Sequence, residues 1–257
     1  MAVDFSKDRA VGIITLDRPP ANSYEIGFVG ELAEAISQAA RDDDVRAVVV
    51  RSASERFFSA GADIKAFVDN SPDANIEMVR AGHRALRAIS EVPKVFVAEI
   101  AAHALGGGLE IALACDLRFG AEGDYKLGLP EVGLGLLPGN GGTQRLARLI
   151  GTSRALDLMV TGRSIGPAEA FELGILDRLV PEADLRSETV AYCERLAAGA
   201  SLAIAGVKEA VSRGVEESLD AGLEREAALI AELFRSADAS EGAAAFVEKR
   251  AATFRGR

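Results

Sequence analysis

The stretch Leu105-Gly106-Gly107-Gly108-Leu109-Glu110 joins a flexible backbone to the expected start of a helix, and Glu131 follows 21 positions after its last residue. Gly107 and Glu110 are three residues apart, so on a helix they share one face. Backbone N–H groups at a helix N-terminus can hold a developing oxyanion. A pair of carboxyl groups can deliver and remove protons around one atom. The stretch therefore predicts an active site with acid–base chemistry.

Length and composition limit the classes of protein to consider. The chain has 257 residues, of which 49% are hydrophobic, enough for one large domain or a domain with an appendage. Its formal net charge is −10, which argues against non-specific binding to nucleic acid, since that needs a basic face. An anionic small molecule held by a local basic cluster remains compatible with this charge.

The cysteines and the N-terminus bear on the compartment. Cys115 and Cys193 are the only cysteines, too few for a disulfide framework, which favours a reducing cytoplasm. The first ten residues, MAVDFSKDRA, lack the basic segment and apolar stretch of a signal peptide. Charges interrupt every apolar segment before membrane-spanning length. We therefore expect a cytoplasmic protein without a membrane or nucleic-acid partner.

The first half of the chain alternates two hydrophobic periodicities. Short segments rich in β-branched residues predict strands at Ala10–Leu16, Arg46–Arg51 and Val95–Ile100. Apolar residues at helical spacing predict helices at Glu25–Ala40 and Met78–Ile89. Alternation of strands and helices favours an α/β layer architecture.

The second half is expected to be mainly helical, because strand signals fade after about Gly141. Helical spacing is found at Leu156–Val160, Pro167–Leu173, Leu185–Ala198, Ser201–Val211 and Leu219–Phe234. The last segment has an apolar stripe, which forms either core or a subunit contact. We expect a core of residues 1–195 and a helical C-terminal region of residues 196–257.

Several short motifs in the sequence lack a feature that the corresponding site needs. Gly162–Gly166 matches G-x-S-x-G, but helical sequence precedes it and no histidine follows it, so Ser164 is interpreted as a loop or capping residue. The run Pro138–Thr143 lacks the G-K-[ST] ending of a P-loop. Two histidines without clustered ligands do not predict a metal site. His103, in an apolar run, is interpreted as packed or locally bonded.

Three segments together make chemical sense. Phe57–Lys65 runs from an apolar edge into small residues that allow a ligand close to the backbone, and Asp63 is a candidate helix cap. Ala104–Glu110 and Leu129–Gly133 carry the two glutamates. In this order, and followed by Pro138–Leu146, the segments resemble the crotonase superfamily, also called the enoyl-CoA hydratase/isomerase family. The resemblance covers nearly the whole chain, from Leu16 to Arg250.

The resemblance implies a fold and an assembly. The expected fold is α/β, a crotonase-like spiral of ββα repeats that forms an acyl-CoA-binding core. Residues 196–257 would form a helical C-terminal trimerisation region, and the protein would be a homotrimer or a homohexamer.

The resemblance also implies roles for individual residues. The substrate would be an acyl-CoA thioester. No separate cofactor is implied, because coenzyme A is part of the substrate, and no metal is implied either. The N–H groups of Ala60 and Gly107 would form the oxyanion hole. Glu110 would deprotonate a water molecule, and Glu131 would give a proton to the α-carbon. Contacts to the substrate or its CoA would come from Ala60, Gly61, Ala62, Asp63, Ile64, Gly107, Lys249 and Phe254, the last two from a neighbouring subunit.

Two features of the site carry further expectations. A helix N-terminus near Glu110 favours its ionised form, as suits a base. A proton donor at neutral pH needs a raised pKa, which burial of Glu131 by Val132 and Leu134 would supply. The segment Ser23–Ile26 differs from the usual family pattern, and we expect it to shape a wall of the pocket.

The leading hypothesis is hydration of a 2-enoyl-CoA, since both glutamates accompany both oxyanion segments. Double-bond isomerisation needs only one well-placed base and is the closest alternative. A hydrolase or dehalogenase would need a nucleophilic carboxylate or a histidine-assisted water, and His103 precedes the glycines. A non-catalytic acyl-CoA binder belongs to a different class and would bind the thioester without turning it over.

Overall fold

Two sheets form the centre of the protein, whose structure, a computed structural model, describes residues 1–256. The six-stranded sheet has the order β1-β2-β3-β5-β7-β9, and the three-stranded sheet has the order β4-β6-β8. The strands are β1 Val3–Asp8, β2 Val11–Leu16, β3 Ala47–Ser52, β4 Phe57–Ser59, β5 Val95–Ile100, β6 His103–Leu105, β7 Leu117–Ala121, β8 Leu127–Gly128 and β9 Arg178–Val180. The helices of the body are α1 Ile26–Arg41, α2 Ile64–Asp69, α3 Pro72–Glu91, α4 Gly107–Ala114, the 3-10 helix η1 Glu131–Leu134, α5 Gly142–Ile150, α6 Thr152–Thr161, α7 Pro167–Glu172 and α8 Glu182–Ala198.

The chain passes through the same unit three times. In each unit one strand joins the large sheet, the next joins the small sheet, and helical structure follows: β3, β4 and α2–α3; β5, β6 and α4; β7, β8 and η1–α5. Pairing within these units is parallel, as in Val49 opposite Val97 and Val97 opposite Leu117. This is the expected spiral of ββα repeats.

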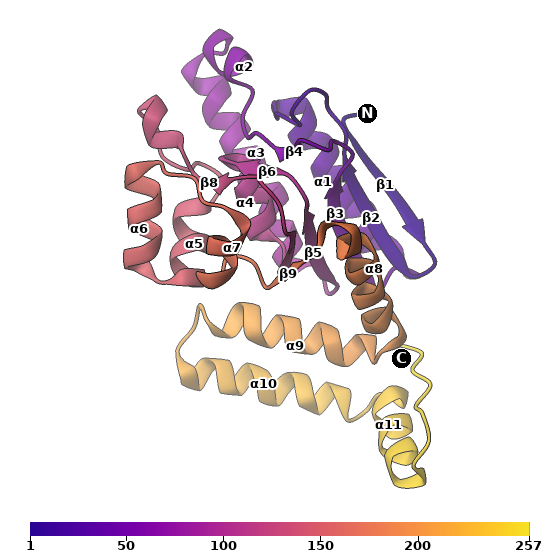
Figure 1. Cartoon of the computed structure of the whole chain (residues 1–257). Coiled ribbons are helices and arrows are strands. Elements are labelled where there is room, and N and C mark those ends of the chain that lie inside the picture. Colours follow the sequence, from indigo (N-terminus) through magenta and orange to yellow (C-terminus); the bar gives the residue numbers. More distant parts are fainter. Residues whose placement is uncertain (257) are drawn as a thin grey trace.

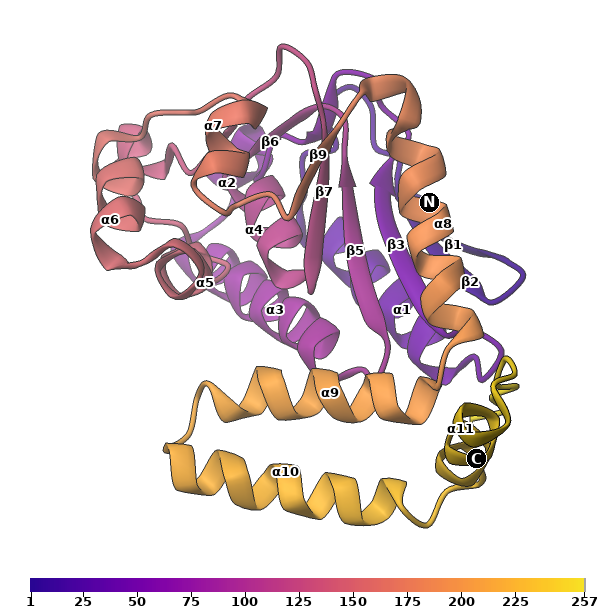
Figure 2. The same cartoon turned by 60° about the horizontal axis from the view of Figure 1, so that its bottom comes forward.

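The large sheet is covered on both faces, which explains its continuous apolar runs. Residues 47–50 of β3 are all buried. Helices α1 and α3 pack against each other beside the sheet, while α8 contacts β3, β5 and β7 and lies along the sheet in Figure 2. The sheet is thereby a rigid support for the loops that follow its strands.

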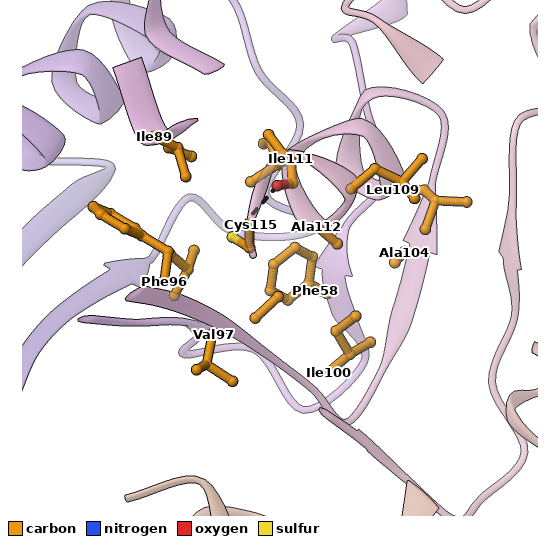
Figure 3. Packing of buried hydrophobic residues seen from close by; sticks show 14 of the residues in the cluster. Phe58, Ile89, Phe96, Val97, Ile100, Ala104, Leu109, Ile111, Ala112 and Cys115 are labelled. Carbon is orange, nitrogen blue, oxygen red and sulfur yellow. Dashed lines mark hydrogen bonds between the residues drawn. The ribbon is translucent and has the colours of Figure 1, made fainter. Parts of the chain in front are cut away.

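Helix α4 is buried along its entire length, which fixes the position of its N-terminus. Figure 3 shows Leu109, Ile111 and Ala112 of this helix among Phe58 and Ile100 from neighbouring strands. These tightly packed surroundings leave little room for α4 to shift, since interiors are close-packed.

The strands and helices expected from the first half agree with the structure to within a few residues, except that α3 begins six residues earlier, at Pro72. After Gly141 the described residues are mainly helical, as expected, with one strand among them. Strand β9 pairs with β7 through Phe119 and Arg178. It has only three residues, all half-buried, and so carries too little apolar pattern to be recognised.

The C-terminal helices lie at one end of the body, α9 Ser201–Gly214 and α10 Leu219–Leu233 side by side and α11 Ala237–Glu248 beyond them (Figure 1). The chain turns from α8 into α9 through 108°. Lys208 of α9 donates to the carbonyl oxygens of Ile89 (2.7 Å) and Lys94 (2.8 Å) and to Asp116 (2.8 Å). This buried ammonium anchors α9 to the body.

No single helix of residues 1–256 is long and apolar enough to cross a membrane. The bent pair formed by α8 and α9 would reach that threshold by length and composition alone.

Candidate active site

The glycines at the start of α4 are required by close neighbours. A Cβ atom on Gly107 would clash with the ring and hydroxyl group of Tyr24. A Cβ atom on Gly108 would clash with the carbonyl group of Ser59. The small residues therefore let two other segments reach the helix N-terminus, as the sequence indicated for a site that binds its ligand with backbone groups.

Gly61 brings the segment Ala60–Ala62 against the start of α4. Gly61 has φ = +86°, and a Cβ atom there would lie 2.9 Å from the carbonyl oxygen of Leu105 and 3.0 Å from the nitrogen of Gly107. Both features favour glycine at this position. Two backbone segments that could each offer an N–H group are thus side by side.

The expected oxyanion donor Ala60 is already engaged, because its N–H group donates to the carbonyl oxygen of Ala21 at 2.9 Å. Ala62 replaces it. The groups on either side of Ala62 bond to Tyr24, since Gly61 accepts from the Tyr24 N–H and Asp63 donates to its carbonyl oxygen, both at 2.9 Å. Backbone N–H groups alternate in direction along an extended segment, so the Ala62 N–H points the other way.

The N–H group of Gly107, the other expected donor, has no such bond. Gly107 is the first residue of α4, and the first N–H groups of a helix have no intrahelical acceptor. Within residues 1–256 no acceptor is found for the N–H of Gly107 or of Ala62. Both residues line the same cavity.

Glu110 is held by the start of another helix. Its Oε1 atom accepts hydrogen bonds from the N–H groups of Asn140 and Gly142, both at 2.7 Å, and Gly142 is the first residue of α5. Its side chain is 1% exposed. Burial raises the pKa of Glu110, while the two N–H bonds and the charge of Arg145 act against that rise. Because both bonds fall on Oε1, the other carboxyl oxygen remains for a ligand.

Glu131 is the first residue of η1 and has a different environment. Burial, with a smaller contribution from the nearby charge of Glu110, raises the pKa of Glu131 to about 7. Its Oε2 atom is buried, and no hydrogen-bond partner for it is found among the described residues. Of the two residues expected to bury it, Leu134 lines the cavity, whereas Val132 packs towards Gly162.

The cavity that joins these groups has a volume of about 150 Å³. Its polar part contains Glu110 and Glu131, and the remainder is mainly apolar. The apolar lining is formed by Ile64, Phe67, Met78, Val79, Leu134, Leu136 and Leu137. Such a lining suits an aliphatic group next to two carboxyls.

The other expected contact residues divide into two groups. Ala60, Ala62 and Ile64 line the cavity. Asp63 caps α2, accepting from the N–H groups of Lys65 and Ala66, and forms an ion pair with Arg18 at 3.0 Å.

Lys249 and Phe254 do not reach the cavity of their own chain. Lys249 lies at the C-terminal end of α11, and Phe254 packs close to Gly242 of that helix. In Figure 1 the C-terminal helices are at the opposite end of the molecule from α2.

Sequence reasoning missed the roles of Tyr24 and Asn140. Ser23–Ile26 was expected to form a pocket wall, and Tyr24 does line the cavity, but nothing predicted where its hydroxyl points. Asn140 belongs to the glycine-rich run and binds Glu110 through its backbone, which no side-chain pattern reveals.

His103 and Ser164 have the structural surroundings that the sequence predicted. His103 accepts from the N–H of Lys126 at 3.0 Å and packs on Phe57, so it is locally bonded. Ser164 follows helix α6 rather than a strand, which rules out a nucleophile elbow.

Residues 6–257 match the profile of the enoyl-CoA hydratase/isomerase family. The chain belongs to this family. A probable enoyl-CoA hydratase of Bacillus subtilis is 38% identical over 258 residues, covering 99% of each chain. A short-chain-enoyl-CoA hydratase of Clostridium acetobutylicum is 33% identical over 249 residues, covering 96% of this chain and 95% of its own.

Solved structures of the family share the fold. An enoyl-CoA hydratase of Geobacillus kaustophilus superposes with a TM-score of 0.98 at 42% identity, covering 100% of this chain and 97% of its own. An enoyl-CoA hydratase of Bacillus anthracis superposes with a TM-score of 0.96 at 34% identity, with both chains fully covered. The crotonase fold expected from the sequence is thereby confirmed.

Proposed function

We propose that the protein is an enoyl-CoA hydratase that adds water in a syn manner across the double bond of a 2-enoyl-CoA thioester. The observation that carries the proposal is the pairing of two carboxyl groups with unlike environments in one cavity. Glu110 is held by two N–H groups, whereas Glu131 has a pKa of about 7 and an unpaired buried oxygen. Unlike pKa values in one site are typical of separate acid and base roles.

The thioester oxygen would bind between the N–H groups of Ala62 and Gly107. Withdrawal of electrons towards that oxygen makes the β-carbon electrophilic. Glu110 takes a proton from the water while the water oxygen bonds to the β-carbon. Glu131 then gives its own proton to the α-carbon. An oxyanion donor of this kind contributes about 3 kcal/mol to lowering the barrier, and an acid–base residue roughly a hundredfold in rate.

The remaining parts of the substrate site follow from the family resemblance. The backbone of Ala60–Ile64 would lie near the adenine end of the CoA, and Lys249 and Phe254 would contact the CoA of a neighbouring subunit. That arrangement needs an oligomer, and we propose a homotrimer or a homohexamer. Apolar residues exposed on the C-terminal helices support such a contact, namely Val207, Val211, Leu219, Leu223, Ile230 and Phe234. Sedimentation velocity would measure the assembly, and a monomer would contradict it.

The two cysteines support a reducing compartment such as the cytoplasm. Cys115 and Cys193 are both buried and both free thiols. Burial raises the pKa of each thiol to about 12, so neither is a reactive thiolate.

The deciding experiment follows the loss of conjugated-thioester absorbance with crotonyl-CoA in the native protein and in Glu131→Gln. Rapid loss in the native protein that is abolished in the variant supports the proposal. Without loss in the native protein, a short-chain hydratase is excluded, and a 3-enoyl-CoA then tests isomerisation. Loss that is unaffected by the substitution would mean that the proton comes from another group.

A further inference from the structure

Tyr24 places a phenolic hydroxyl in the cavity of the two glutamates. Its side chain is 6% exposed and lies just before α1, where it packs against Phe28. The hydroxyl occupies the position that a Cβ atom on Gly107 would need. It therefore lies directly against the residue whose N–H is an oxyanion donor, while Glu110 and Glu131 line the same cavity.

One residue holds both Tyr24 and Glu110. The side-chain amide of Asn140 donates to the Tyr24 hydroxyl oxygen, and the Asn140 backbone N–H donates to Oε1 of Glu110. The phenol and the carboxylate are therefore neighbours around one asparagine. Tyr24, Asn140 and Glu110 all line the same cavity.

The hydrogen of the Tyr24 hydroxyl has no assigned acceptor. With the Asn140 amide nitrogen facing it, the hydroxyl accepts from Asn140 and no described residue accepts in turn from Tyr24, while Oδ1 of the same amide is buried without a partner among the described residues. A hydroxyl has one donor besides its two acceptor positions, and a buried donor without an acceptor costs free energy. Burial and the nearby charges of Glu110 and Glu131 raise the pKa of Tyr24, so the phenol keeps its hydrogen at physiological pH.

We propose that Tyr24 is a further catalytic residue, which donates a hydrogen bond to the water oxygen that adds to the β-carbon. This inference rests on the proposed hydratase function. As Glu110 removes one proton from the water, that oxygen gains negative charge and forms the C–O bond, and the electrons of the double bond move to the thioester oxygen. A donor next to Glu110 stabilises the charge on the attacking oxygen. In dehydration the same donor stabilises the departing oxygen.

The test removes one oxygen atom by Tyr24→Phe. We expect kcat for hydration of crotonyl-CoA to fall about tenfold, as for loss of a hydrogen bond to a group that becomes charged, with KM little changed. A second reaction separates this role from packing. Exchange of the α-proton of butyryl-CoA in D2O needs Glu131 and the oxyanion donors but no attacking water. That exchange should keep its native rate in Tyr24→Phe.

Tyr192→Phe is the matched control, because it also removes a phenolic oxygen but on the far side of the sheet, where Tyr192 packs on Phe119. It should hydrate at the native rate. Hydration by Tyr24→Phe at the native rate would overturn the inference. A fall of hydration and exchange by the same factor would also overturn it, because the hydroxyl would then act on the thioester oxygen or on packing. A native protein that does not hydrate would instead refute the proposed function itself.

Discussion

The carboxyl group of Glu131 lies directly over Gly106, so that a Cβ atom on this glycine would lie 2.9 Å from Oε1. Gly106 also has φ = +53°, the left-handed region that residues with a side chain adopt at a cost. It immediately precedes α4, whose first residue is Gly107, the proposed oxyanion donor. One residue without a side chain thus lies next to both the proposed oxyanion donor, Gly107, and the proposed proton donor, Glu131.

Gly106→Ala should impair both the oxyanion donor and the proton donor. We expect kcat for hydration to fall at least tenfold, because the methyl group displaces the Glu131 carboxyl, and the free energy of unfolding to fall by about 1–2 kcal/mol from the positive φ. Steady-state kinetics and urea unfolding measure the two effects. Gly133→Ala is the matched control, since a Cβ atom there meets nothing within 4 Å and no positive φ is involved. Native kinetics in Gly106→Ala would contradict the assigned position of the acid.

The pKa of Glu131 makes hydration depend on pH. Hydration uses the protonated carboxyl as the donor, so its kcat/KM should fall as pH rises through about 7. The overall reaction takes up no proton, so kcat/KM for dehydration, which is the reverse reaction, should fall through the same pH. Values with crotonyl-CoA and 3-hydroxybutyryl-CoA between pH 5 and pH 9 would reveal this common limb. A hydration profile that is flat across pH 7 would assign the proton donor to another group.

Glu131 should also lower stability at alkaline pH. Its folded pKa of about 7 is above the ordinary value of 4.5, so between these values the folded state binds more protons than the unfolded state. The free energy of unfolding therefore decreases as pH rises through this window, by the linkage relation. Glu131→Gln removes the penalty and should raise Tm at pH 8 but leave it nearly unchanged at pH 4. Equal Tm differences at the two pH values would exclude this origin.

The sequence could predict those parts of the fold and site that are local in the chain. Strand β5 has the predicted bounds, and Asp63 caps α2 as predicted. Both features depend only on residues that are neighbours in the sequence. Glu110 and Glu131 were placed by their motifs, and both line the cavity. Periodicity and short motifs are sufficient for features of this kind.

The errors concern groups whose role depends on distant segments. The donor had been assigned to Ala60 because motif position does not record which N–H is already bonded; its partner, Ala21, comes from another loop. The hydroxyl of Tyr24 was missed because it meets Asn140 only in the folded chain. Backbone direction and long-range hydrogen bonds are tertiary properties, which local patterns do not contain.

Two substitutions of Glu110 should separate its effect on kcat from its effect on the stability of the fold. Glu110→Gln can keep an oxygen for the N–H groups of Asn140 and Gly142 but cannot take a proton, so kcat should fall about a hundredfold or more with little loss of stability. Glu110→Ala removes the acceptor as well, and a buried N–H without a partner costs about 1–3 kcal/mol. Kinetics and urea unfolding of both variants test this. A stable Glu110→Ala would show that the two bonds contribute nothing.

Lys208 should stabilise the contact between α9 and the body without affecting the chemistry. Its side chain is 4% exposed, and its ammonium is bonded to Ile89, Lys94 and Asp116. Lys208→Met leaves the Asp116 carboxylate without its cationic partner, and breaking a buried ion pair in this way costs about 3–5 kcal/mol. Adding Asp116→Asn removes the uncompensated charge and should restore part of the loss. Urea unfolding measures both variants, and kcat of the folded protein should stay near native. A single variant as stable as the native protein would show that the anchor is dispensable.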